Sequence, residues 1–347
     1  MEIIKDIILE IFSEENEMTD SKRIPKVHIV YHKSDMDGWA SCAIFKWALE
    51  NKYLKFPIDN FEIHLIPYNY GFYFPFHKVE EQDMIIMVDA SLPVEEMYSL
   101  YDMVRGKFIW IDHHITVLES LKDFKAIGSR SVEHSACMLS FQWIKNNLTE
   151  LGKSKSSKFW ENLERVYSYF DTYDIYNQDS NIWIEALTMN YLFGSLDINP
   201  EFEESSKYFW ADVFASCESD MVDELIEDFV RDGTLIQTAF NNYDTQLVRA
   251  YGFEATFEGL KIFFINRGIG GSAVFSKINT DKYDAVSCFV YSGKKDLYSF
   301  SFYAQKPETN LVPIFDKYGG GGHKGAGGIR VKSFKYNPNS KEIELFQ

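Results

Sequence analysis

Histidines and aspartates directly follow three apolar runs of this chain. They are His32, Asp35 and Asp37 after the first run, Asp89 after the second, and Asp112, His113 and His114 after the third. In a parallel sheet, the carboxyl ends of neighbouring strands meet at one edge, where such folds bind their ligands. Carboxylates and imidazoles together suit divalent cations, and one carboxylate can bridge two of them. The pattern therefore predicts a site for two metal ions, roughly 3.5–4 Å apart.

Strand-like and helical runs alternate around these residues. Strands are expected at 27–31, 61–66, 84–88 and 107–111, and helices at 38–50, 94–104 and 135–147. This alternation predicts the α/β class with a doubly wound parallel sheet. Ser135 directly precedes an apolar helix and is predicted to be its N-cap.

The length of 347 residues favours more than one domain. Residues 1–25 are predicted to form an amphipathic helix and a tether, and residues 26–195 the doubly wound domain. We expect a helical connector at 196–250 and a smaller α/β domain with a mixed sheet at 251–347. Within the connector, Arg231-Asp232-Gly233 predicts the end of a helix.

Composition narrows the possible partners. The chain has 35 Lys and Arg residues against 52 Asp and Glu residues, a net charge of −17, which disfavours long duplex DNA. The sequence contains no apolar run of bilayer-spanning length, no secretory signal pattern and no paired cysteine motif. We therefore expect a cytoplasmic protein with no membrane partner. Formation of a homodimer stays open.

A glycine-rich segment near the carboxyl end has a binding pattern of its own. It contains Gly320, Gly321, Gly322, His323 and Lys324. Consecutive glycines let backbone N–H groups close around an anion, and the histidine and lysine add donors. The flanks are not serine-rich, so the segment predicts a substrate-binding loop rather than a flexible linker.

In combination and order, these motifs resemble those of the DHH phosphoesterases, in the branch that carries a DHHA1 domain. This superfamily includes short-oligoribonuclease-like and RecJ-like proteins. The family's first motif matches His32–Gly38, its triplet matches Asp112–His114, and its fourth motif matches Tyr173–Tyr176. The resemblance covers residues 26–330. It implies a DHH catalytic domain followed by a DHHA1 substrate-binding domain.

The resemblance also implies two metal sites that share one aspartate. Their ligands would be His32, Asp35 and Asp89 for one ion, and Asp37, Asp89, His113 and Asp174 for the other. Asp171 lies three residues before Asp174 and would share its helical face, so either is a candidate for the fourth-motif ligand. We prefer Asp174 from its local match.

Two further roles concern catalysis and the substrate. The resemblance implies that His114 faces the substrate phosphate, and Asp112 is placed to orient an imidazole. Many relatives carry an Arg before the glycines, but residues 298–305 contain none. That phosphate clamp is either missing or supplied by Arg267, Lys277 or Lys306. The segment that begins at Arg267 predicts either an anion-binding turn or a plain hairpin.

The activity implied by the resemblance is metal-dependent hydrolysis of a phosphoric ester. Two Mn²⁺ ions, with Mg²⁺ or Co²⁺ as alternatives, would provide a bridging hydroxide. The leading hypothesis is a phosphodiesterase that converts short oligonucleotides to mononucleotides. A cyclic-dinucleotide or adenosine-bisphosphate phosphoesterase is the alternative, and a nucleotide sensor without catalysis comes from a different class.

Overall fold

The computed structural model describes residues 23–54, 60–268 and 272–347. The helix predicted at residues 3–12 lies outside them. Two compact units divide the chain, Met1–Ile236 and Gln237–Gln347. The domain limits predicted at residues 25, 195 and 250 stay predictions.

The first unit is built on a four-stranded parallel sheet with the order β2-β1-β3-β4. Its strands are β1 (Lys26–His32), β2 (Glu62–Tyr68), β3 (Met84–Val88) and β4 (Phe108–Ile111). Every residue of β3 and β4 is buried. Strands covered on both faces are apolar without alternation, which explains the uninterrupted apolar runs. The predicted α/β class with a parallel sheet is confirmed.

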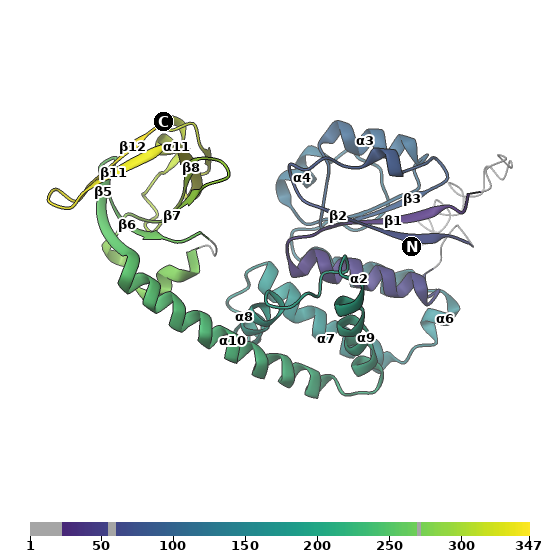
Figure 1. The fold of residues 1–347 in the computed structure, drawn as a ribbon. Helices are drawn as coiled ribbons and strands as arrows, with labels where there is room; N and C mark the ends of the chain where they lie inside the picture. The colour runs from purple at the N-terminus through teal and green to yellow at the C-terminus, as the bar shows by residue number, and fades with distance from the viewer. Residues whose placement is uncertain (1–22, 55–59, 269–271) are drawn as a thin grey trace. The chain divides into compact units, whose positions relative to one another are not determined.

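Helices cover both faces of this sheet (Figure 1). One face packs against α3 (Val94–Met103) and α4 (Ile115–Ser120). The other packs against a larger layer, formed by α2 (Met36–Glu50), α5 (Ala136–Asn146), α7 (Ser157–Asp174), α8 (Trp183–Phe193) and α9 (Glu203–Glu218). A short helix, α6 (Glu150–Lys153), follows α5, and a 3₁₀ turn (Phe76–Lys78) precedes β3. The sheet thus separates two apolar cores.

The second unit contains an eight-stranded mixed sheet with the order β11-β12-β5-β6-β7-β8-β10-β9. Its strands are β5 (Gly252–Phe257), β6 (Leu260–Asn266), β7 (Ala285–Ser292), β8 (Leu297–Ala304), β9 (Gly321–Gly322), β10 (Ala326–Val331), β11 (Ser333–Asn337) and β12 (Glu342–Phe346). Helix α11 (Val312–Lys317) packs on it, and 3₁₀ turns occupy Ser272–Lys277 and Thr280–Lys282. The pairs β6–β7 and β5–β12 are parallel and the other pairs are antiparallel. The predicted mixed sheet is confirmed.

The predicted helix end at Gly233 is wrong. Helix α10 (Val222–Tyr251) is 30 residues long and continues through Gly233. A Cβ atom at Gly233 would lie 2.4 Å from the carbonyl oxygen of Thr188 in α8, so the glycine permits close helix packing rather than a C-cap. No helix in the described ranges, α10 included, combines the length and the apolar character needed to cross a bilayer.

Gly38 lets helix α2 begin directly against the end of β1. A Cβ atom there would lie 2.0 Å from the carbonyl oxygen of His32. We predict that Gly38→Ala lowers the free energy of unfolding by about 1–3 kcal/mol, because the first turn of α2 must move away from β1. Urea unfolding measures this change. Gly293→Ala is the control, since its nearest neighbouring atom is 3.8 Å away. Equal stability of the two variants would contradict the prediction.

Candidate metal centre

Three adjacent strands of the parallel sheet end at the same level. Tyr31 in β1 pairs with Val88 in β3, and Val88 pairs with Ile111 in β4. The residues that follow these positions are therefore neighbours at the carboxyl edge of the sheet. They are His32, Asp89 and Asp112, so the convergence predicted from the sequence is present in the structure.

The first ligand group combines one imidazole with two carboxylates. Nδ1 of His32 lies 2.8 Å from Oδ2 of Asp35 and 3.5 Å from Oδ2 of Asp89. Asp35 is the N-cap of α2, and its Oδ1 accepts a hydrogen bond from the N–H of Gly38 at 3.2 Å. The cap fixes the carboxylate and leaves Oδ2 facing the histidine. These three side chains can hold one metal ion.

The second ligand group surrounds Nε2 of His113. This nitrogen lies 3.5 Å from Oδ2 of Asp37, 3.5 Å from Oδ2 of Asp174 and 3.6 Å from Oδ1 of Asp89. Asp37, His113 and Asp174 can hold a metal ion. Asp89 presents Oδ2 to the first group and Oδ1 to the second, as a bridging carboxylate does.

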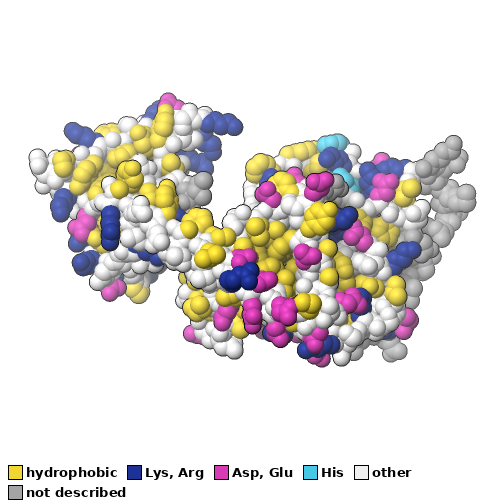
Figure 2. Space-filling view, turned by 60° about the horizontal axis from the view of Figure 1, so that its bottom comes forward, with side chains coloured by type: hydrophobic (Ala, Val, Ile, Leu, Met, Phe, Trp, Pro, Cys, Tyr) yellow, Lys and Arg dark blue, Asp and Glu magenta, His cyan; other side chains and the backbone are white. Residues whose placement is uncertain are grey.

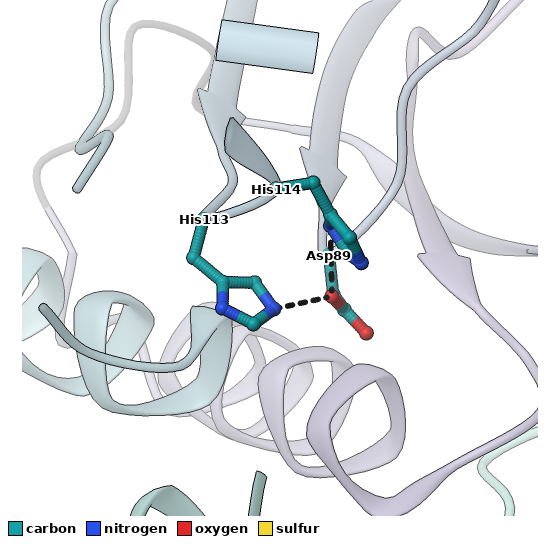
Figure 3. A group of neighbouring side chains, drawn as sticks. All are labelled: Asp89, His113 and His114. Carbon is teal, nitrogen blue, oxygen red and sulfur yellow. Dashed lines mark ion pairs between the residues drawn. The ribbon is translucent and has the colours of Figure 1, made fainter. Parts of the chain in front are cut away.

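Figure 3 shows how the strand ends bring Asp89 between His113 and His114. Asp89 follows β3 directly and has a φ of 51°, a left-handed conformation that aspartate tolerates better than most residues. Nδ1 of His114 lies 3.8 Å from Oδ1 of Asp89. A third possible metal group, Asp89, His113 and His114, therefore overlaps the second one.

Asp37 is fixed by the start of helix α5. Its Oδ2 accepts from the N–H of Ala136 at 2.9 Å, and its Oδ1 accepts from the N–H of Cys137 at 2.6 Å. Ser135 occupies the N-cap position, as predicted, but its hydroxyl makes no capping hydrogen bond. The positive end of the helix dipole favours a carboxylate at this place. The capping acceptor of α5 is thus a residue 99 positions away in the sequence.

The structure separates the two fourth-motif candidates. Asp171 accepts from the N–H of Ser135 at 2.6 Å and lies 2.9 Å from Nδ1 of His134. Asp174 belongs to the second ligand group, and its buried Oδ2 has no hydrogen-bond partner among the described residues. Asp174 is thus placed to bind a metal ion, whereas Asp171 holds the loop before α5.

Asp112 orients His114. Its Oδ1 accepts from the backbone N–H groups of His113 at 2.7 Å and His114 at 3.1 Å, and it lies 2.8 Å from Nδ1 of His114. A carboxylate at this distance favours the tautomer with the proton on Nδ1 of His114. The hydrogen bond with Asp112 is the main cause that raises the pKa of His114 above its ordinary value.

The electrostatics of the site favour added positive charge. Burial is the main cause that raises the pKa of Asp37 and Asp89, and for Asp89 the charge of Asp37 adds to it. Burial and the same charge raise the pKa of Asp174 to about 8. For His32, burial lowers the pKa, but hydrogen bonds with Asp35 and Asp89 raise it to about 10. Such a donor set fits divalent cations.

The sequence reasoning missed Tyr70 and His134. The ring centroid of Tyr70 lies 5.6 Å from that of His32 and 6.0 Å from that of His114. Tyr70 follows the end of β2, so the rule that found Asp89 applies to it. Tyrosine is not one of the common ligands of a divalent cation, so the strand-end pattern of metal ligands does not include Tyr70. No local pattern indicated His134, whose partner Asp171 is 37 residues away.

In the second unit, the glycine segment is an edge strand rather than a free nest. Gly321 and Gly322 form β9 and pair with Gly328 and Gly327 of β10. The N–H of Gly320 donates to Phe315 at 2.8 Å, and the N–H of His323 donates to Ala326 at 2.9 Å. These two N–H groups are therefore already used. Exposed side chains of the segment are those of His323 and Lys324.

The candidate cations for a phosphate clamp all have partners. Nη2 of Arg267 lies 3.0 Å from Oδ1 of Asp244 in a largely buried ion pair. Lys277 donates to Oδ1 of Asn241 at 2.5 Å, and Lys306 lies 2.6 Å from Oδ1 of Asp284. A substrate role for Arg267 therefore stays a prediction, and such a role would require it to leave Asp244.

The chain matches one family model and several solved structures. Residues 26–164 match the family model described as DHH family, N-terminal domain. Solved structures that match this chain include the pGpG-specific phosphodiesterase PggH from Vibrio cholerae, at 15% identity and a TM-score of 0.45, covering 88% of this chain and 92% of that chain. Another is an exopolyphosphatase-related protein from Bacteroides fragilis, at 12% identity and a TM-score of 0.46, covering 95% and 91%. No curated protein matches the sequence.

Separate replacement of Asp171 and Asp174 in helix α7 distinguishes a metal ligand from a residue that stabilises the fold. We predict that Asp174→Ala weakens Mn²⁺ binding at least tenfold, because the second ligand group loses an oxygen. Asp171→Ala is expected to lower the free energy of unfolding by about 1–3 kcal/mol, since the N–H of Ser135 loses its acceptor. Titration calorimetry and urea unfolding measure the two effects. The opposite pattern would make Asp171 the ligand.

Metal binding is expected to release protons. In the metal-free protein the pKa of Asp174 is about 8, above the ordinary value of 3.8, so this carboxyl carries a proton at pH 7. A cation must displace that proton, and Mn²⁺ affinity should therefore rise between pH 6 and pH 8. Calorimetry in two buffers with different ionisation enthalpies measures the proton release. An affinity that does not change with pH would contradict the expectation.

Proposed function

Residues 26–164 match the DHH family model, and we propose that this chain is a phosphoric-ester hydrolase of that family that converts short oligonucleotides to mononucleotides. One observation carries the proposal. Asp89 presents one oxygen to each of two ligand groups, as a site for two cations requires. Two divalent cations bound there would activate water near neutral pH and stabilise the charge that develops on the phosphoryl group.

The protein's own residues would orient and polarise the substrate. The raised pKa of His114 favours its protonated form, in which Nε2 can donate a hydrogen bond. We propose that it donates to a phosphoryl oxygen, while Asp112 keeps the ring in place. The exposed His323 and Lys324 of the second unit are proposed to contact the substrate.

We propose Mn²⁺ as the preferred cation. The first ligand group combines an imidazole with two carboxylates, and the second combines an imidazole with three when the bridging Asp89 is counted. Carboxylate-rich sites suit Mg²⁺ and Mn²⁺, and imidazole shifts the preference towards Mn²⁺. Mg²⁺ and Co²⁺ are the alternatives.

A short substrate fits the charge of the chain better than a long one. A net charge of −17 opposes the approach of a long polyanion. A cyclic dinucleotide and adenosine bisphosphate are equally small and form the alternative substrate class. The full set of metal ligands speaks against a sensor that only binds nucleotides.

Turnover of a matched substrate panel tests the proposal. The panel holds an RNA dinucleotide, a long single-stranded RNA, a cyclic dinucleotide, adenosine bisphosphate and pyrophosphate, each with Mn²⁺. We expect the dinucleotide to be cleaved fastest and Asp89→Ala to lose turnover almost completely. Preference for the cyclic compound would support the alternative. Inactivity on all five would contradict hydrolysis and favour the sensor.

A second prediction separates a substrate contact from a metal ligand. We expect His114→Ala to lower kcat by about 10²-fold, because a preorganised donor to the phosphoryl oxygen is lost. Its Mn²⁺ affinity is expected to stay within threefold of the wild type. Stopped-flow turnover and calorimetry measure these values. A large loss of Mn²⁺ binding would instead assign His114 to the third possible metal group.

A further inference from the structure

A groove of about 780 Å³ runs along strand β2 of the first unit. Residues from Ile63 to Tyr68 form one side of it, with Lys33, Lys46, Phe72, Tyr73 and Lys78 among the other lining residues. In the described part of the chain, β2 pairs only with β1. Its other edge therefore offers backbone N–H and C=O groups that a ligand can use.

Exposed aromatic rings stand at the end of this groove. The segment after β2 contains Tyr70, Phe72 and Tyr73, which are 42%, 64% and 78% exposed. Nζ of Lys33 lies 5.3 Å from the ring centroid of Phe72. Aromatic faces next to cationic groups are the common means of holding the bases and phosphates of a single strand.

The groove is locally basic although the chain is acidic. Three lysines line it, against two carboxylates, Glu50 and Glu201. Lys46 lies 3.9 Å from Glu50, while Lys33 and Lys78 have no carboxylate partner within the described ranges. Over the face drawn in Figure 2, acidic side chains are scattered among hydrophobic and basic ones. An excess of one lysine over the carboxylates of the lining suits a short anion rather than a long one.

Hydrogen bonds connect the groove to the metal ligands. Lys33 follows His32, and its N–H donates to the carbonyl oxygen of Tyr68 at 2.9 Å. Nδ2 of Asn69 donates to Oγ of Ser34 at 2.7 Å. Tyr70 then lies next to His32. Residues 68–70 therefore contact both the groove and the segment that carries His32.

We propose that this groove binds the nucleotides of a single-stranded oligonucleotide beyond the phosphate that is cleaved. Phe72 and Tyr73 would stack on bases, and Lys33 and Lys78 would contact phosphates. The edge of β2 from Ile63 to Tyr68, which has no strand partner in the described ranges, is roughly 20 Å long and accommodates more than one nucleotide. The inference rests on the proposed function and makes its substrate more specific: trinucleotides and tetranucleotides would gain contacts that a dinucleotide lacks.

Kinetics on two substrate lengths test the groove. We compare kcat/KM for an RNA tetranucleotide and an RNA dinucleotide in the wild type and in the double variant Phe72→Ala, Tyr73→Ala. The ratio of tetranucleotide to dinucleotide is expected to fall about tenfold, mainly through KM. Tyr208→Ala is the control, because Tyr208 is 72% exposed on α9 and does not line the groove. An unchanged ratio in the double variant, with both substrates cleaved, would overturn the groove and leave the proposed function standing.

A binding measurement keeps the two proposals distinguishable. Fluorescence anisotropy of a labelled tetranucleotide with Ca²⁺ in place of Mn²⁺ needs no turnover. We expect Lys78→Gln and the double variant each to weaken binding at least fivefold, whereas equal binding would overturn the groove even if no RNA is cleaved. Sedimentation tests a protein occupant. Suppose that the wild type is a dimer, that the double variant is a monomer, and that the tetranucleotide does not dissociate the wild-type dimer. The groove would then be a protein interface, which would contradict the proposal.

Discussion

Carboxylates forced together at the end of a buried sheet repel one another, and the surrounding structure is arranged to hold them. Asp37 accepts hydrogen bonds from two N–H groups at the start of α5, and Asp35 accepts one as the N-cap of α2. Asp112 accepts hydrogen bonds from two N–H groups of its own turn. Backbone donors thus offset part of the repulsion and fix these carboxylates before a cation binds.

Two members of the cluster have less compensation. Asp89 is buried and faces His32 and His113 at distances of 3.5 and 3.6 Å. One oxygen of Asp174 has no hydrogen-bond partner among the described residues and lies 3.5 Å from Nε2 of His113. Burial raises the pKa of both, to about 8 for Asp174. Backbone hydrogen bonds therefore stabilise three carboxylates, those of Asp35, Asp37 and Asp112. The carboxylates of Asp89 and Asp174 lack such bonds within the described ranges, and a bound cation would stabilise their negative charge.

Much of this centre follows from local sequence, because strands buried on both faces must be apolar and their polar successors must gather at one edge. The remaining features depend on contacts between distant segments. Gly233 fits the sequence pattern of a helix end, but its close packing on α8 explains a glycine inside α10. Asp171 and Asp174 share a helical face, and contacts of Asp171 with His134 and Ser135 from a distant segment are what distinguish their surroundings. The partner of Arg267 likewise lies on another element.

Asp37 serves both as a metal-ligand candidate and as the acceptor for the first N–H groups of α5. Its loss would affect folding as well as chemistry, since a helix start buried in the larger core would lose a charged cap. Selection on the amount of folded protein alone would then retain this carboxylate. A descendant of this chain that no longer needed catalysis would still tend to keep part of the site, so the presence of Asp37 is weaker evidence of activity than the presence of Asp89.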